Sequence, residues 1–570
     1  MEPTVAIGVQ DFETIRMNHY FYIDKTDFIR QWWEAGDSVT LITRPRRFGK
    51  TLMMSMVGQF FSVNYASRSD LFHNTKIWKE SYYRELQGTY PVIFLSFANV
   101  KERDCRSAKK RICQILTDLY IQNDFLRQSD FLQDKERAFF ESVSPDMDDT
   151  TATMALHQLS GYLYRYYKKK VIILLDEYDT PLQEAYVDGY WEDFTAFIRN
   201  MFNAAFKTNP HLERAIMTGI TRISKESIFS DLNNLEVVTT TSEKYEECFG
   251  FTEQEVFAAL DEFGFADRKW EVKDWYDGFI FGRARDIYNP WSILNFLDKG
   301  KIAAYWANTS SNGLIGELLR KANKEIKQDF ELLMKGGTLV TALDEQIVYN
   351  QLDRKKNAIW SLLLAGGYLK ATDVNRDIKR RKWLYHLCLT NMEVHVMFEG
   401  MIEDWFEDDS SNYNDFIAAL LLGDVEAMNV YMNRLSMSVF SFFDTGMHPS
   451  GQREPERFYH GFVLGLVVEL QGRYEILSNR ESGFGRYDVM MMPKDLRDQA
   501  IIMEFKVFDP QKEKDLDETA GNALAQIREK RYAAQLETQG ICADRIKSYG
   551  FAFRGEEIVI RGNADSARDI

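Results

Sequence analysis

The chain has 570 residues, which is too many for a single hydrophobic core, so we expect about three domains. Its hydrophobic content of 45% and charged content of 27% are ordinary for a globular protein, and no apolar run approaches the roughly 20 residues of a membrane span. The net charge of −16 argues against a protein that coats nucleic acid through its overall charge, although short basic clusters are compatible with local contacts.

The cysteines and histidines exclude several classes of site. The five cysteines are scattered without Cys-x-x-Cys spacing, and the eight histidines are not paired at ligand spacing. These patterns argue against a zinc site and a disulfide framework, and they fit a reducing cytosol. The N-terminus has no signal-peptide pattern, so the expected location is cytoplasmic.

The first motif is a phosphate-binding loop near the N-terminus. Val39–Ile42 predicts a strand, and Leu52–Phe61 predicts a helix. Between them lies Arg44-Pro-Arg-Arg-Phe-Gly-Lys-Thr51, so the order is strand, loop, Gly-Lys-Thr and helix, as in a P-loop. Lys50 would reach the β- and γ-phosphates, and the Thr51 hydroxyl would hold Mg²⁺. Backbone N–H groups at the helix start would face the anionic oxygens.

One position of this loop departs from the P-loop pattern. Arg44 stands where G-x-x-x-x-G-K-[ST] has its first glycine. Glycine permits a turn with positive φ there, which arginine adopts only under strain. The loop therefore needs a partner motif before it can predict a nucleotide site.

The partner motif is a buried strand that ends in acids. Val171–Leu175 is a continuous apolar run, and Asp176-Glu-Tyr-Asp179 follows it. In this Walker B arrangement Asp176 would hold Mg²⁺, directly or through water, and Glu177 would polarise the attacking water. A strand that ends in an ordinary polar turn is the alternative. Because the motif follows a P-loop with strand–helix alternation, the pair predicts a nucleotide site.

A later strand predicts a group that senses the γ-phosphate. Arg214–Arg222 predicts another strand that ends in polar residues, and Thr218, Thr221 and Arg222 are the candidates. Ordinary capping of the strand end is an equal alternative. An arginine finger supplied in trans is a further alternative, for which Arg222 is again a candidate.

The middle of the chain is mainly helical in pattern. Thr252-Glu-Gln-Glu255 is a capping box, and the aromatic segment from Trp275 to Ser292 is expected to pack a helical lid onto the nucleotide domain. Trp360–Leu369, the basic run Arg376–Lys382 and Leu384–Leu389 predict a helix followed by a hairpin, the outline of a winged-helix-like module. Interdomain packing is the favoured role of this hairpin, and nucleic-acid contact is the alternative.

A second set of chemical residues lies near the C-terminus. Arg486–Met492 and Ala500–Val507 predict two strands, which present Asp488 on the first and Glu504 and Lys506 on one face of the second. Burying a carboxylate and an ammonium in so apolar a strand is costly unless something compensates. Mg²⁺ would compensate, with Asp488 and Glu504 as ligands and Lys506 orienting water or steadying a phosphate.

A helix and a last strand complete this set. Ala523–Tyr532 predicts a helix that would place Gln526 near the metal, and Tyr549–Phe553 predicts the strand. Hairpin, Glu-x-Lys strand, helix and strand form the core of a restriction-endonuclease-like nuclease. An edge strand whose Glu–Lys face is solvated is the alternative.

Two resemblances cover most of the chain. Residues from about 5 to 290 resemble the AAA-ATPase-like family, related to STAND-type and archaeal ATPases, in which the P-loop regularly reads Arg-Pro-Arg-Arg-Phe-Gly-Lys-Thr. Arg44 is then a family trait. The matching segments are Tyr22-Ile-Asp-Lys-Thr26, Arg44-Pro-Arg-Arg-Phe-Gly-Lys-Thr51, Leu175-Asp-Glu-Tyr-Asp179 and Phe229-Ser-Asp-Leu-Asn-Asn234.

Residues from about 455 to 555 resemble the PD-(D/E)xK nuclease domain. The resemblance implies that Glu456, Asp488 and Glu504 form an acidic metal site. It also implies that Lys506 is catalytic and that Gln526 supports the site. The matching positions are Glu456, Ser478–Asp488, Glu504-Phe-Lys506 and Gln526, and the full set is present.

The sequence thus predicts an α/β protein with three parts. These are a P-loop ATPase domain with a parallel sheet flanked by helices (residues 1–295), a helical lid and winged-helix-like region (296–450) and an α/β restriction-endonuclease-like domain (451–570). The predicted nucleotide-binding residues are Arg46, Arg47, Phe48, Gly49, Lys50, Thr51, Leu52, Asp176 and Arg222. The predicted catalytic residues are Glu177, Asp488, Glu504, Lys506 and Gln526. The predicted metal ligands are Thr51, Asp176, Glu456, Asp488 and Glu504.

The expected function is a Mg²⁺-dependent nuclease that ATP drives or regulates. Its expected substrate is nucleic acid, DNA in the first place, and a role in defence or mobile-element biology is a plausible extension. No membrane partner is expected, and assembly into a homo-oligomer is compatible with the sequence. The alternative is a nucleotide-dependent signalling switch whose C-terminal domain binds nucleic acid or a partner without cutting.

Overall fold

The computed structural model describes most of the chain and divides it into two compact units. The first unit comprises Met1–Leu318 and Leu332–Phe398, and the second comprises Leu319–Glu331 and Glu399–Ile570. The predicted domain boundaries at residues 295 and 450 stay predictions. The described residues are 4–128, 131–222, 228–229, 232–306, 313–320, 324–343, 356–377, 382–407, 410–439, 463, 467, 470, 473–478, 481–482, 485–486, 488–495, 497–554 and 557–563.

A five-stranded parallel sheet organises the first unit. Its strands, in spatial order, are β2 (Val92–Ser96), β3 (Val171–Asp176), β4 (Leu212–Gly219), β1 (Val39–Thr43) and β5 (Leu235–Val238). Strands β1 and β3 are buried along their whole length, as expected for parallel strands that are covered on both faces. Because β4 lies between them, the residues that follow β1, β3 and β4 meet at the carboxyl edge of the sheet.

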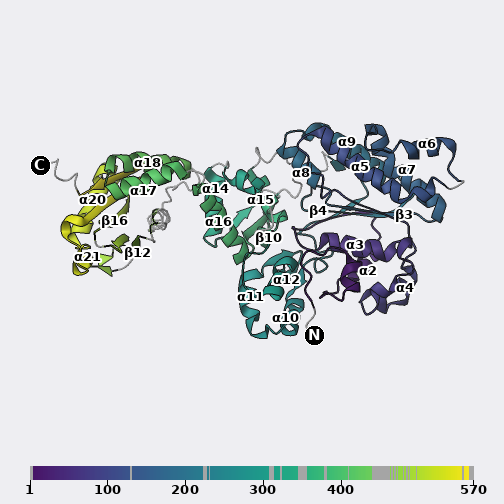
Figure 1. The fold of residues 1–570 in the computed structure, drawn as a ribbon, viewed down its shortest axis with the longest axis horizontal. Helices are drawn as coiled ribbons and strands as arrows, with labels where there is room; N and C mark the ends of the chain where they lie inside the picture. The colour runs from purple at the N-terminus through teal and green to yellow at the C-terminus, as the bar shows by residue number, and fades with distance from the viewer. Residues whose placement is uncertain are drawn as a thin grey trace. The chain divides into compact units, whose positions relative to one another are not determined.

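Helices cover both faces of this sheet (Figure 1). Side chains alternate between the faces, so that Leu41 packs with one set of helices and Ile42 with the other. The set beside Leu41 is α5 (Cys105–Gln122), α6 (Asp134–Ser142), α7 (Asp149–Tyr167), α8 (Thr180–Val187) and α9 (Trp191–Phe202). The set beside Ile42 is α1 (Phe12–Met17), α2 (Asp27–Ala35), α3 (Lys50–Phe61) and α4 (Ser81–Leu86).

Two smaller sheets follow in the first unit. The predicted capping box is confirmed, since the Thr252 hydroxyl accepts from the Glu255 N–H and the Glu255 carboxylate accepts from the Thr252 N–H. The predicted helix with a hairpin is also confirmed. The elements of the first unit in this part of the chain are β6 (Phe251–Thr252), α10 (Glu253–Glu262), α11 (Lys269–Tyr276), β7 (Phe279–Phe281), β8 (Ala284–Tyr288), α12 (Pro290–Lys299), β9 (Leu339–Thr341), α15 (Lys356–Ala365), β10 (Leu369–Asp377) and β11 (Lys382–Leu389). Helices α13 (Gly313–Arg320), α14 (Lys324–Met334) and α16 (Met392–Glu407) each contribute residues to both units.

The second unit is built on a five-stranded mixed sheet with helices on both faces. Among the strands described in this sheet, β16 and β17 pair in parallel and the other neighbours pair antiparallel. The strands, in spatial order, are β12 (Tyr474–Ser478), β15 (Val489–Pro493), β16 (Ala500–Val507), β17 (Ile546–Arg554) and β18 (Glu557–Gly562), and β13 (Glu481–Ser482) pairs with β14 (Gly485–Arg486). Helices α17 (Ser410–Leu422) and α18 (Val425–Val439) cover one face, and α20 (Leu516–Glu529) and α21 (Ala534–Thr538) cover the other.

Both sheets therefore confirm the predicted α/β fold class. The alternative of a solvated edge strand for Glu504 and Lys506 is wrong, because β16 lies between β15 and β17. Among the described helices, none combines the length and the apolar character that crossing a membrane requires.

Candidate functional site

A cavity of about 630 Å³ opens at the carboxyl edge of the parallel sheet. This volume lies within the usual range of small-molecule pockets. The cavity is lined by every predicted nucleotide-binding residue except Arg222, which is not among the described residues that border it. Glu177 also lines it, together with residues of the N-terminal segment and of α12.

Lys50 is the first residue of α3 and is held tightly inside this cavity. It is 3% exposed, and its Nζ donates to the carbonyl oxygens of Arg44 and Pro45, at 3.1 Å each. The same Nζ lies 3.6 Å from Oε1 of Glu177. The P-loop ammonium and the Walker B glutamate, predicted separately, are therefore neighbours.

Thr51 and Asp176 bring two oxygen donors together. The Thr51 hydroxyl donates to Asp176 Oδ2 at 2.8 Å, and the Thr218 hydroxyl donates to the other oxygen of the same carboxylate. Burial and then the charge of Glu177 raise the pKa of Asp176. Hydroxyl and carboxylate oxygens are the ligands that Mg²⁺ prefers, and a cation would offset the burial of two acids, so the residues fit this ion.

The two residues after Glu177 fix the turn that follows β4. The Tyr178 hydroxyl donates to the carbonyl of Thr221 at 2.7 Å. Asp179 Oδ2 accepts from the N–H groups of Ile220 and Thr221 and from the Thr221 hydroxyl, at 2.9, 2.8 and 2.8 Å. A Cβ at Gly219 would lie 2.5 Å from the other Asp179 oxygen, so this close approach requires glycine. Sequence reasoning assigned no role to Tyr178 or Asp179, whose only signal was their place beside two acids.

Arg44 lies in a closed cage next to the P-loop. The residue is fully buried, and its Nη1 donates to the carbonyl oxygens of Thr43 and Thr239 at 3.0 and 2.7 Å. Its guanidinium carbon lies 4.7 Å from the ring centroid of Phe281 and 5.6 Å from that of Phe249. Burial lowers the pKa of Arg44 to about 10, which leaves it charged at neutral pH.

Arg44 does not adopt the positive φ that a glycine at this position would permit. Arg44 is not among the residues with positive φ; within the loop these are Arg47 at 65° and Gly49 at 79°. The left-handed backbone conformations thus occur later in the loop than position 44, and one of the two residues that adopt them is a glycine. The side chain of Arg44 points away from the turn into its cage, which is why this position tolerates arginine.

Downstream residues anchor the rest of the loop: Asn289 and Trp291 of the aromatic segment expected to pack the lid, and Trp306 beyond it. The Arg46 carbonyl accepts from Trp306 Nε1 at 3.0 Å and from Asn289 Nδ2 at 3.3 Å. The Arg47 guanidinium carbon lies 4.2 Å from the ring centroid of Trp291. The P-loop is therefore held from outside by downstream residues, in addition to its own turns.

In the second unit, Asp488 lies directly before β15, rather than on the predicted strand, and Glu504 lies on the neighbouring strand β16. Asp488 Oδ2 accepts from the Phe505 N–H at 2.8 Å. Glu504 is 3% exposed, and its carboxylate accepts from Nε2 of Gln526 on α20. Lys506 is half-buried, two residues further along β16, and so shares the Glu504 face.

Tyr532 is a member of this site that sequence reasoning missed. Gln526 Nε2 also lies 3.3 Å from the Tyr532 hydroxyl, to which it donates. Burial raises the pKa of Tyr532, and the carboxylates of Glu504 and Asp488 raise it further. The two carboxylates offer hard oxygen donors, and a divalent cation would compensate their burial, so they fit Mg²⁺. Glu456, the other predicted ligand, lies outside the described residues.

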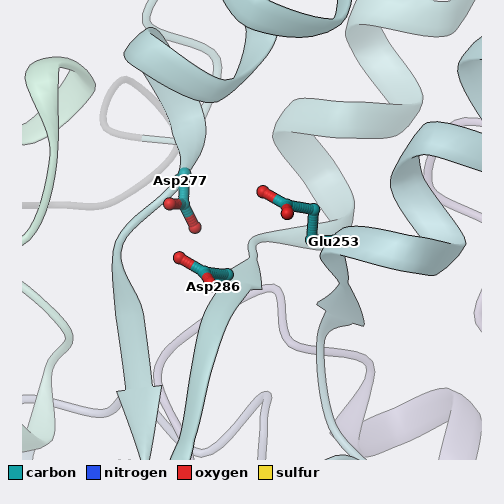
Figure 2. Close-up of side chains that lie close together, drawn as sticks. All are labelled: Glu253, Asp277 and Asp286. Carbon is teal, nitrogen blue, oxygen red and sulfur yellow. The ribbon is translucent and has the colours of Figure 1, made fainter.

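A separate acidic cluster in the first unit resembles a metal site but is explained without one. Carboxylate oxygens of Glu253, Asp277 and Asp286 lie within 4.8 Å of one another (Figure 2). Lys273 pairs with Glu253, and its Nζ lies 3.8 Å from Asp286. Burial and the neighbouring Asp286 raise the pKa of Asp277 to about 7. A lysine and a shared proton thus stabilise the cluster.

This cluster predicts a pH dependence of stability. Because the folded pKa of Asp277 lies above its unfolded value, its contribution is present at low pH and is lost as the pH rises toward 7. We expect urea unfolding to show a loss of roughly 1–2 kcal/mol between pH 5 and 8. Asp277→Asn, whose amide donates to Asp286 at any pH, should flatten that dependence relative to an Asp274→Asn control. An equal slope in both variants would contradict the assignment.

Comparison with known proteins finds two family matches in separate parts of the chain. Residues 6–229 match the family model described as predicted AAA-ATPase, and residues 454–562 match that of the PD-(D/E)XK nuclease superfamily. The chain is also 25% identical, over 555 residues and 94% of each chain, to an uncharacterized protein in the vnfD 5′ region of Azotobacter chroococcum mcd 1. The protein therefore combines an AAA-ATPase-like domain in its N-terminal part with a C-terminal domain of the PD-(D/E)XK nuclease superfamily.

Proposed function

We propose that this protein binds and hydrolyses ATP in its first unit and thereby controls a Mg²⁺-dependent nuclease in its second unit. The two family matches support nucleotide-dependent nuclease activity in general terms. The observation that carries the proposal is the meeting of Lys50, Thr51, Asp176 and Glu177 in one cavity. These are the residue types that phosphoryl transfer from a nucleoside triphosphate requires.

In the proposed ATPase, Lys50 exchanges its carbonyl partners for the β- and γ-phosphates. The N–H groups at the start of α3, together with the helix dipole, stabilise the same negative charge. Thr51 and Asp176 would hold Mg²⁺, which supplies charge neutralisation of the phosphates when bound. Glu177 is then free to orient the attacking water. Arg222 stays a candidate for a finger that acts in a homo-oligomer.

In the proposed nuclease, Asp488 and Glu504 would hold Mg²⁺, with Glu456 as a further predicted ligand. Lys506 orients the attacking water, and Gln526 fixes the Glu504 carboxylate through its amide. The oxygen of that water bonds to phosphorus as the water gives up a proton to solvent, the bond from phosphorus to the leaving sugar oxygen breaks, and that sugar oxygen takes up a proton from solvent. We propose DNA as the nucleic acid that is cut.

The cellular setting is also a proposal. All five cysteines are free thiols, which agrees with a reducing cytoplasm. The acidic net charge of −16 favours the alternative function, a nucleotide-dependent switch that binds nucleic acid or a partner without cutting. The presence of Asp488, Glu504 and Lys506 together favours the nuclease, because a domain that only binds nucleic acid does not need this set of residues.

Cleavage of plasmid and single-stranded DNA tests the proposal, with Mg²⁺ or Mn²⁺ and with or without ATP. We expect the parent to cut, and Lys506→Ala to lose cutting by at least about a hundredfold because the attacking water loses its orienting cation. Lys514→Ala, an exposed lysine of the same unit, is the matched control. DNA binding that persists in Glu504→Ala without cutting rejects the switch. Absence of cutting under every condition, with ATP turnover intact, rejects the nuclease.

A further inference from the structure

The β10–β11 hairpin packs at its base and is exposed toward its tip. At the base Leu369 and Leu387 are buried, and Arg285 Nη2 donates to the Thr372 carbonyl at 3.2 Å. In the distal half, Val374 and Trp383 are 41% and 56% exposed. The base of the hairpin thus packs against the rest of the first unit, as expected of a packing module. The exposed distal half is available to contact another molecule.

The two faces of the distal half have different chemistry. Cross-strand partners share a face of the ladder, and here Val374 pairs with Tyr385 and Arg376 with Trp383. These four residues, which we name the wing face, combine two aromatic rings, a guanidinium and an apolar side chain. On the opposite face, Asn375 Nδ2 donates to Asp373 Oδ2 at 3.0 Å and lies 3.2 Å from His386 Nε2. Leu384 and Lys382, the cross-strand partners of Asn375 and Asp377, share this face, which has no aromatic pair.

The wing face has the two contacts that a single strand of nucleic acid needs. The Arg376 guanidinium carbon lies 5.9 Å from the Trp383 ring centroid, so a cation and an exposed ring stand side by side. Bases stack on such rings, and phosphates pair with such cations, without sequence preference. Five of the seven residues from 376 to 382 are Lys or Arg, in a chain whose net charge is −16. This local excess of positive charge complements a polyanion.

We propose that the wing face binds a single-stranded segment of nucleic acid, with a base stacked on Trp383 and a phosphate paired with Arg376. The inference rests on the proposed nuclease function and deepens it, because it names a substrate-contacting surface that is distinct from the cutting residues. Duplex binding would instead use phosphate contacts alone, since paired bases are not available for stacking.

Anisotropy of a labelled single-stranded oligonucleotide, mixed with the full chain in EDTA so that no cutting occurs, tests the proposal. We expect Trp383→Ala to raise Kd by about fivefold to a hundredfold, whereas Trp383→Phe keeps a ring and most of the affinity. Arg376→Ala should lower the slope of log K against log salt by about 0.7. Asn375→Ala, on the opposite face of the same hairpin, is the matched control and should bind as the parent does.

Several outcomes overturn the inference. One is that Trp383→Ala and Arg376→Ala both bind the oligonucleotide as tightly as the parent. Another is that Asn375→Ala loses as much affinity as they do. A parent that binds only duplex, or binds no nucleic acid, also overturns it and points to a protein partner. A separate cleavage assay on the parent shows whether the proposed nuclease activity also fails, or whether the proposed binding by the wing face fails alone. Binding through the wing face without any cutting rejects the nuclease and keeps the wing face.

Discussion

ATP turnover should fall by about a hundredfold to a thousandfold in Lys50→Ala, because the variant lacks the preorganised ammonium that stabilises negative charge developing on the phosphates in the transition state. Lys50 already lies 3.6 Å from Glu177 and donates to two loop carbonyls, so it is positioned before nucleotide arrives. If ATP controls the nuclease, the dependence of DNA cutting on ATP should disappear in the same variant. Phosphate release and plasmid cleavage, measured on the same preparation, check both effects.

Two further variants separate chemistry from folding in this experiment. Lys50→Met keeps the aliphatic stem and should lose ATP turnover while unfolding at the same urea concentration as the parent. Lys110→Ala removes a lysine whose Nζ pairs with Asp146 on the surface, and it should turn over ATP as the parent does. Turnover in Lys50→Met within a factor of a few of the parent would mean that the cavity is not the ATPase site.

The sequence was most informative where structure and chemistry are local. Strands β1 and β3 are mainly apolar and lead directly into their motifs, so the motif and the strand could be located together. The positions of Lys50, Thr51 and Asp176 around one cavity follow from the parallel order of those strands. Likewise, Asp488, Glu504 and Gln526 could be predicted as one set from two strands joined by a short turn, a helix beside them and the resemblance to PD-(D/E)xK nucleases.

Contacts between distant segments could not be predicted in the same way. Strand β17 begins about forty residues after β16 ends, and its parallel pairing is what makes β16 a central strand. The cage of Arg44 is built from Thr239, Phe249 and Phe281, whose spacing has no periodic signal. Tyr532 lies beside Gln526 because the chain turns after α20, and such a turn leaves no motif.

The cage of Arg44 leads to a prediction that runs against the P-loop consensus. Arg44→Gly restores the glycine of G-x-x-x-x-G-K-[ST], yet we expect it to lower the free energy of unfolding by about 3–5 kcal/mol. The change empties a fully buried site, leaves the Thr43 and Thr239 carbonyls without their donor and removes the contact with Phe281. The backbone gains nothing, since Arg44 has no positive φ that glycine would relieve. Urea unfolding with tryptophan fluorescence measures the change.

Arg103→Ala is the control for this prediction, because Arg103 is an exposed arginine of the same unit. Its unfolding curve should match that of the parent. An Arg44→Lys variant keeps the charge but has no planar fork to reach several carbonyls, so it should fall between Arg44→Gly and the parent. If Arg44→Gly is as stable as the parent, the cage contributes no net stability, because the cost of burying the guanidinium then equals what its contacts supply.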